Sequence, residues 1–147
     1  GSFVRALQAI DPDIHPVGQG CALLVPLVEN GYINFDNQVT RLVLEDYLRP
    51  IRESGADTLI LGCTHYPLLT DIIREIMGPE VSLVNAGAES VHTLRDALAR
   101  RQLLAPEGTG QALLCTSDRP EGFGQMARRF LQEEPTAPVR LVDIERY

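Results

Sequence analysis

The sequence predicts an α/β fold with a mostly parallel sheet flanked by helices. Two short apolar runs, residues 58–61 and 81–84, end at turn-forming residues and alternate with stretches whose apolar side chains recur at helical spacing. Connections of only a few residues join these elements, which is typical of parallel sheets with right-handed crossovers. Because the sequence opens within a helical pattern rather than with a strand, we expect an α/β unit truncated at its N-terminus.

Residues 3–28 predict a helix, a loop and a strand. The apolar stripe of the helix stops at Asp11 and Pro12, and it consists of Phe3, Val4, Leu7 and Ile10. The loop that follows is rich in Pro, Gly and Asp. Residues 21–28 are apolar apart from Pro26, which predicts a strand that leads into a short helical turn.

The middle of the chain predicts a helix, a strand and another helix. Residues 37–54 have an amphipathic pattern, and Pro50 is expected to kink or shorten that helix. Residues 58–61 are the central strand. Pro67 suits the first turn of the next helix, where a missing N–H costs nothing, and that helix is expected to stop at Gly78.

The next strand, residues 81–84, ends at the turn residues 85–87. The carboxyl ends of parallel strands meet at one edge of a sheet, where open α/β proteins bind their ligands. We therefore expect residues 62–65 and residues 85–87 to line one cleft. Beyond it the pattern predicts a helix, a linker-like loop, a strand, a helix and a strand, at residues 89–101, 103–110, 111–115, 123–131 and 139–144.

Composition excludes several classes of partner. The 147 residues carry a net charge of −7, with no basic face or aromatic platform for nucleic acid, and no apolar run approaches the roughly 18 residues of a membrane span. Three widely spaced cysteines without a CxxC pair predict neither a disulfide framework nor a metal site, and they fit a reducing, cytoplasmic setting. His15 and His92 have no partner at ligand spacing and are interpreted as surface or loop residues, so no metal is expected.

The turn after the central strand is the candidate chemical centre. It places Cys63, Thr64 and His65 before a helix, where free N–H groups and the positive helix end can lower a thiol pKa from about 8.5 to roughly 3.5–7.5. Cys63 could then act as a thiolate base, with Thr64 holding a ligand or capping the helix and His65 moving protons. The plainer interpretation is a small buried cysteine, an N-cap and a solvated histidine. Glu29, the first charge after residues 21–28, could orient a histidine, although most turn glutamates are simply solvated.

Two strings carry a family resemblance, LGCTHYPLL at residues 61–69 and CALLVPLVENG at residues 21–31. Together they resemble the carboxyl-terminal half of glutamate racemases, members of the cofactor-independent aspartate/glutamate racemase superfamily. Aspartate racemases of that superfamily look like GCTE at this point, so His65 favours glutamate. The resemblance covers nearly the whole chain.

The resemblance implies racemisation of L- and D-glutamate without a cofactor, by two cysteines on opposite faces of the α-carbon. Cys63 would be the second of these cysteines and act on the L-enantiomer, His65 and Glu29 would assist its proton transfers, and Thr64 would bind substrate. It also implies a cytoplasmic role supplying D-glutamate for peptidoglycan, and a homodimer.

The resemblance predicts a division of the chain as well. Residues 1–87 would form most of the second α/β domain, and residues 88–147 would complete the first, so the final strands would have to pair within the chain or with another copy. The DSG-like loop and the ACNTA-like loop with the first cysteine have no counterpart here, and Cys21 and Cys115 lie in the wrong contexts to replace it. We therefore expect a fragment that is inactive or half-active alone. The alternatives are a racemase acting on aspartate or another amino acid, and a non-catalytic amino-acid-binding module.

Overall fold

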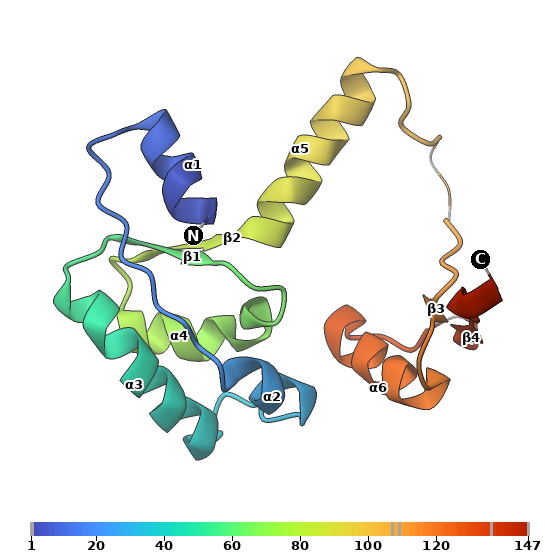
Figure 1. The fold of residues 1–147 in the computed structure, drawn as a ribbon, viewed down its shortest axis with the longest axis horizontal. Coiled ribbons are helices and arrows are strands. Elements are labelled where there is room, and N and C mark those ends of the chain that lie inside the picture. The colour runs from blue at the N-terminus through green and yellow to red at the C-terminus, as the bar shows by residue number, and fades with distance from the viewer. Residues whose placement is uncertain (1, 107, 109, 136, 147) are drawn as a thin grey trace. The chain divides into compact units, whose positions relative to one another are not determined.

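A computed structural model describes residues 2–106, 108, 110–135 and 137–146. The chain divides into two compact units between Thr93 and Leu94. Each unit combines helices with one parallel pair of strands, which confirms the predicted α/β class (Figure 1). The roles predicted for residues 1–87 and 88–147 remain predictions.

The first unit is built around two parallel strands, β1 (Thr58–Leu61) and β2 (Ser82–Asn85). Their register runs from Thr58 opposite Ser82 to Leu61 opposite Asn85, so both strands end side by side. Figure 1 shows α1 (Ser2–Ile10) on one side of the sheet and α3 (Gln38–Glu53) and α4 (Thr70–Met77) on the other. The short helix α2 (Leu24–Glu29) lies beside α3.

The core of this unit lies between the sheet and the helices α2, α3 and α4. Its buried apolar side chains are Leu24, Val28, Leu44, Leu48, Ile51, Leu61, Leu69, Ile72, Ile73 and Met77. Thr40 is buried among them, and its hydroxyl donates to the Tyr32 carbonyl at 2.6 Å, which satisfies the polar group. The core therefore holds the elements that flank the turn after β1.

The helices depart from the predicted pattern at two prolines. Helix α3 starts as expected at the Asn37 cap, whose Oδ1 accepts from the Thr40 amide at 3.0 Å, but it continues past Pro50 to Glu53. Pro67 lies not in an α-helix but in the 3₁₀ helix η1 (Tyr66–Leu69), and α4 begins only at Thr70. A proline removes one N–H donor, and a helix tolerates that near its ends.

Of the strand and short helical turn predicted at residues 21–28, the strand is wrong and the helical part is confirmed. A turn covers residues 22–23, and α2 follows directly, with Pro26 in its first turn where an N–H would have no helical acceptor. Length explains the misassignment, because a short apolar run does not distinguish a strand from a buried helix.

Helix α5 (Ala86–Arg100) carries the chain from the first unit into the second. Asn85 caps it immediately after β2, so the predicted loop at residues 85–87 is the start of a helix. The second unit then contains β3 (Cys115–Thr116), α6 (Pro120–Leu131), β4 (Arg140–Leu141) and the 3₁₀ helix η2 (Ile144–Arg146).

The final strands pair with each other, which is one of the two arrangements predicted for them. β3 and β4 are parallel, with Cys115 opposite Arg140 and Thr116 opposite Leu141. Both are much shorter than the predicted runs at residues 111–115 and 139–144. Within the described part of this unit, no further strand pairs with β3 or β4, and no residue is buried. Few contacts are therefore available to stabilise longer strands. None of the helices described has the length and apolar character of a membrane span.

Candidate active site

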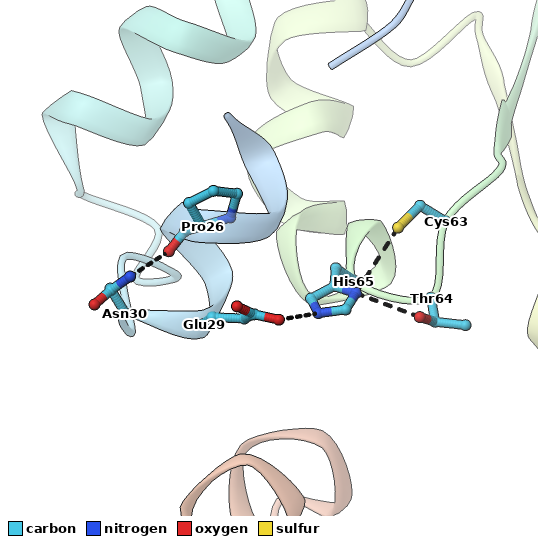
Figure 2. Close-up of polar contacts among 6 residues, drawn as sticks. All are labelled: Pro26, Glu29, Asn30, Cys63, Thr64 and His65. Atoms are coloured by element: carbon cyan, nitrogen blue, oxygen red, sulfur yellow. Dashed lines mark hydrogen bonds and ion pairs between the residues drawn. The ribbon is translucent and has the colours of Figure 1, made fainter. Parts of the chain in front are cut away.

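The turn after β1 presents three side chains in succession. β1 ends at the buried Leu61, and a backbone bond from the Tyr66 amide to the Cys63 carbonyl, 3.2 Å long, folds the chain back into η1. The side chains of Cys63, Thr64 and His65 project from this turn (Figure 2). The predicted placement of Cys63 at the end of the central strand is confirmed.

His65 links the turn to α2 through a line of polar contacts. Its Nε2 lies 3.2 Å from Glu29 Oε1, and its Nδ1 lies 3.8 Å from Cys63 Sγ and 3.3 Å from Thr64 Oγ1. Figure 2 shows the imidazole ring between Glu29 on one side and Cys63 and Thr64 on the other. The structure therefore brings together all four residues singled out from the sequence, although Glu29 and His65 are 36 positions apart.

The contacts favour one path for proton transfer between these side chains. A carboxylate only accepts hydrogen bonds, so the Glu29 contact favours a proton on His65 Nε2 and leaves Nδ1 to accept from the Cys63 thiol or the Thr64 hydroxyl. Transfer of the thiol proton to Nδ1 gives a thiolate beside an imidazolium, which the Glu29 carboxylate stabilises from the far side. The arrangement suits a thiolate base with an adjoining proton store.

Packing holds Glu29 in place at the end of α2. Leu24 and Val28, on the same helix, are buried in the core. The Asn30 side-chain amide donates to the Pro26 carbonyl at 2.8 Å and satisfies a carbonyl in the last turn of α2 (Figure 2). The Glu29 side chain remains 48% exposed and that of His65 19%, so water screens the carboxylate more than the ring.

A pocket of about 420 Å³ opens beside Cys63. Residues after both strands line it, Gly62, Cys63 and Thr64 on one side and Asn85 to Ala88 on the other. The expectation that these two stretches line one cleft is confirmed for residues 62–64 and 85–87, whereas His65 does not line this pocket. Of the three cysteines, only Cys63 lines this pocket.

The helix that begins at this pocket is α5. The sequence pattern predicted that this helix starts at residue 89, after a loop, whereas it starts at Ala86. Asn85 Oδ1 accepts from the Gly87 amide at 3.0 Å and from the Ala88 amide at 3.2 Å, capping α5 at its first turn. A Cβ on Gly87 would lie 3.3 Å from that oxygen, so glycine permits the close approach. The positive end of a 15-residue helix thus faces the pocket, whereas the α4 helix begins seven residues after Cys63.

Tyr66 is a residue that the sequence argument missed. Its side chain hydrogen-bonds Cys21, and burial, aided by the nearby Cys21 and Cys63, raises the pKa of the phenol to about 12. Burial also raises the pKa of the Cys21 thiol, while the bond from Tyr66 acts in the opposite sense. The phenol therefore remains neutral at physiological pH, and no signal in the sequence pointed to it, because its bond to Cys21 joins separate parts of the chain.

None of the remaining candidates lines this pocket. Cys21 lines a different groove, and Cys115 is an exposed thiol in the second unit. His15 lies in a loop and His92 on α5, both exposed as predicted. Among the residues the structure describes, no three His, Cys, Asp or Glu side chains gather as metal ligands would.

Sequence comparison relates the chain to bacterial glutamate racemases. The enzyme from Geobacter metallireducens is 40% identical over 131 residues, which are 88% of this chain and 48% of that protein. The enzyme from Thermoanaerobacter sp. strain X514 is 34% identical over 146 residues, 99% of this chain and 54% of that protein. The chain therefore spans about half the length of these curated relatives. No protein-family model matches it.

Solved structures agree with the sequence comparison. A glutamate racemase isoform from Bacillus anthracis superposes with a TM-score of 0.87 at 28% identity, over 97% of this chain and 52% of that one. The glutamate racemase of Francisella tularensis, solved in complex with D-glutamate, gives 0.87 at 26% identity, over 99% and 53%. These similarities in sequence and structure agree with the α/β fold and with the turn after β1. They identify the chain as a homologue of the glutamate racemases that corresponds to about half of such a protein.

Proposed function

We propose that this chain carries one half of a glutamate racemase active site, in which Cys63 exchanges the α-proton of glutamate. The observation that carries the proposal is the line of contacts from Cys63 through His65 to Glu29, beside a pocket at the carboxyl ends of both strands. The relatives named glutamate racemase, one of them solved with D-glutamate, support the choice of substrate.

The chemistry assigns a role to each residue. The Cys63 thiolate removes the α-proton of L-glutamate, so that the C–H bond breaks, an S–H bond forms and the electron pair stays on the α-carbon. His65 takes the thiol proton before this step and Glu29 stabilises the resulting imidazolium. The Thr64 hydroxyl and the positive end of α5 offer electrostatic support for a substrate carboxylate. No cofactor enters these steps.

Racemisation also needs an acid on the opposite face of the α-carbon. Cys63 is the only cysteine that lines the pocket, so in this proposal the second thiol comes from polypeptide beyond these 147 residues. The same proposal makes the complete enzyme a cytoplasmic supplier of D-glutamate for peptidoglycan, acting as a homodimer. An aspartate racemase, or a binding module without catalysis, would share the fold, and substrate exchange distinguishes these alternatives.

The test is incorporation of deuterium at the α-carbon in heavy water, followed by NMR or mass spectrometry. We expect this chain to exchange L-glutamate much faster than D-glutamate or aspartate, because a single thiol removes and returns the proton on one face. Cys63→Ser should abolish the exchange and His65→Asn should slow it by about 10²-fold or more. Cys115→Ser is the matched control, since that exposed thiol lies in the second unit and its loss should change nothing.

Three results would contradict the proposal in different ways. Exchange of aspartate in preference to glutamate would favour the other racemase. Glutamate binding without any exchange would favour the binding module. Equal exchange of both glutamate enantiomers would show that the chain assembles a complete site by itself.

A further inference from the structure

The helix that carries Glu29 is too short to hold its own position. Helix α2 has only six residues, and no side chain caps its start at Leu23. A helix of this length is unstable by itself in water, so contacts with the rest of the unit fix where it lies. Leu24 and Val28 supply buried apolar contacts, but apolar packing is not directional. The position of the Glu29 carboxylate therefore depends on directional contacts at the two ends of α2.

Both ends of α2 make such contacts with the turn after β1. At the end of the helix, His65 Nε2 lies 3.2 Å from Glu29 Oε1 (Figure 2). At the start, the Tyr66 phenol hydrogen-bonds the thiol of Cys21, whose carbonyl accepts from the Leu24 amide at 3.2 Å and so begins the helix. Two adjacent residues of the turn thus bind the two ends of one helix.

The bond between Tyr66 and Cys21 has a defined direction. The Cys21 thiol lies 3.7 Å from the Gln19 carbonyl, to which it can donate its only proton. Its sulfur is then left to accept from the phenol. Because the pKa of that phenol is raised to about 12, the phenol keeps the proton that it donates at physiological pH. This order of donors and acceptors, from phenol to thiol to carbonyl, orients the Cys21 side chain from two directions.

Tyr66 is fixed to the candidate catalytic turn as well as to α2. Its backbone amide donates to the Cys63 carbonyl at 3.2 Å, which closes the turn. Its ring is half-buried and packs against the core of the first unit, as Cys21 does. Removal of the hydroxyl alone would therefore break the contact with the start of α2 and leave the ring packing and the turn in place.

We propose that Tyr66 is a positioning residue, whose phenol sets α2 against the turn so that the Glu29 carboxylate meets the imidazole of His65. This inference rests on the proposed function, in which Glu29 and His65 activate Cys63, and Tyr66 itself touches no reacting atom. Without the phenol, α2 is free to shift along the turn. A shift of about 1 Å would lengthen the 3.2 Å contact between Glu29 and His65 beyond hydrogen-bond range.

The test is NMR of the His65 ring nitrogens in the 147-residue chain, at a pH where imidazole is neutral. Glu29→Ala defines the signals of the ring without its carboxylate. We expect Tyr66→Phe to shift both ring-nitrogen signals most of the way from the parent values to those of Glu29→Ala. The reason is that Nε2–H loses its acceptor, so the two nitrogens then share the proton. His92, which is exposed on α5, provides an internal reference whose signals should not move.

Variants of Cys21 separate a lost hydrogen bond from a general loss of stability. Cys21→Ala should produce the same shift although the phenol is intact, and the double variant with Tyr66→Phe should shift the signals no further than either single change. Cys21→Ser keeps an oxygen that can accept from the phenol and should restore the parent signals. A general loss of stability would not distinguish serine from alanine at this position.

Two other tyrosines are matched controls, because each can lose a hydroxyl alone. Tyr32 follows α2 and is 42% exposed, so Tyr32→Phe should leave the His65 signals unchanged. The Tyr47 hydroxyl accepts from the Leu23 amide at 3.3 Å and ties the start of α2 to α3 rather than to the turn. Tyr47→Phe should therefore shift the His65 signals much less than Tyr66→Phe.

The kinetic effect should have the form expected of a positioning residue. Tyr66 does not line the pocket beside Cys63, so Tyr66→Phe should leave the concentration of L-glutamate that gives half-maximal deuterium exchange unchanged. The maximal rate of exchange should fall about three- to tenfold, which is the usual net effect of one hydrogen bond.

Any of three results would overturn this role of Tyr66. The first is that the His65 signals of Tyr66→Phe equal those of the parent chain. The second is that Cys21→Ser shifts them as far as Cys21→Ala does. The third is that Tyr47→Phe shifts them as far as Tyr66→Phe, which would assign the placement of α2 to α3. A parent chain that exchanges no glutamate would contradict the proposed function, but the NMR comparisons would still decide the role of Tyr66, so the two proposals fail separately.

Discussion

The two units of this chain have similar elements but very different interiors. In the first unit ten apolar side chains are buried, and they fix α2, α3, α4 and the end of β1 relative to one another. In the second unit α6 is amphipathic and the two strands are parallel, yet no described residue is buried. Secondary structure with an apolar side is therefore present in both units, but only the first closes it into a core.

The candidate site depends on the unit that has the core. Glu29 reaches His65 because Leu24 and Val28 anchor α2, and the turn with Cys63 follows directly from the buried Leu61. The second unit offers a cysteine too, but Cys115 lies exposed on a two-residue strand with no comparable support. Precise placement of reactive side chains requires a packed scaffold beneath them.

The largest expected difference between the units is the cost of truncating a core side chain. Leu44 is fully buried, so Leu44→Ala should lower the free energy of unfolding of the first unit by about 2–5 kcal/mol. Leu98→Ala, on the part of α5 in the second unit, should cost less than about 1 kcal/mol because the side chain is only half-buried.

Amide hydrogen exchange in urea measures the two units separately, which a single melting temperature would not. Equal destabilisation by Leu44→Ala and Leu98→Ala would show that the second unit has a core of its own or shares the first.

A smaller effect should come from the cap between β2 and α5, the helix that joins the units. Asn85→Ala removes the acceptor of the Gly87 and Ala88 amides and should cost about 1 kcal/mol. Asn85→Asp keeps an acceptor at the positive helix end and should retain most of that stability. Exchange of the amides in the first turn of α5 is the direct measurement. If both variants behave like the parent chain, α5 is held by something other than its cap.

The sequence predicted the elements whose signals are local. The strand at residues 58–61 has the predicted bounds, because Gly62 stops it and β-branched and apolar residues fill it. The helix at residues 38–53 also lies where its pattern placed it, because Asn37 provides a cap. Residues 21–28 were misassigned because their apolar run has no periodicity that distinguishes a buried strand from a helix.

The candidate site was predictable only in part. The succession of Cys63, Thr64 and His65 is visible in the sequence, but the contact of His65 with Glu29 spans 36 positions and depends on how α2 packs. The contribution of Tyr66 was invisible for the same reason, since its bond to Cys21 also joins separate elements. The short β3 and β4 strands show the opposite case, because local signals were present but no further strand among the described residues extends their sheet.

The smallest expected difference concerns surface ion pairs, which need no core. Arg41 Nη2 lies 2.9 Å from Glu75 Oε2 and donates to the Phe35 carbonyl, and its guanidinium lies 5.4 Å from the Phe35 ring centroid. The pair Arg128–Glu134 in the second unit is longer, at 3.3 Å, and both of its side chains are about half exposed or more. A double-mutant cycle should give a small coupling for Arg41 and Glu75 that falls as salt rises, and none that is measurable for Arg128 and Glu134. Geometry explains this order, because Phe35 holds Arg41 in one orientation before it meets the carboxylate. Equal coupling in the two units would mean that ordering of the arginine contributes nothing to the pair.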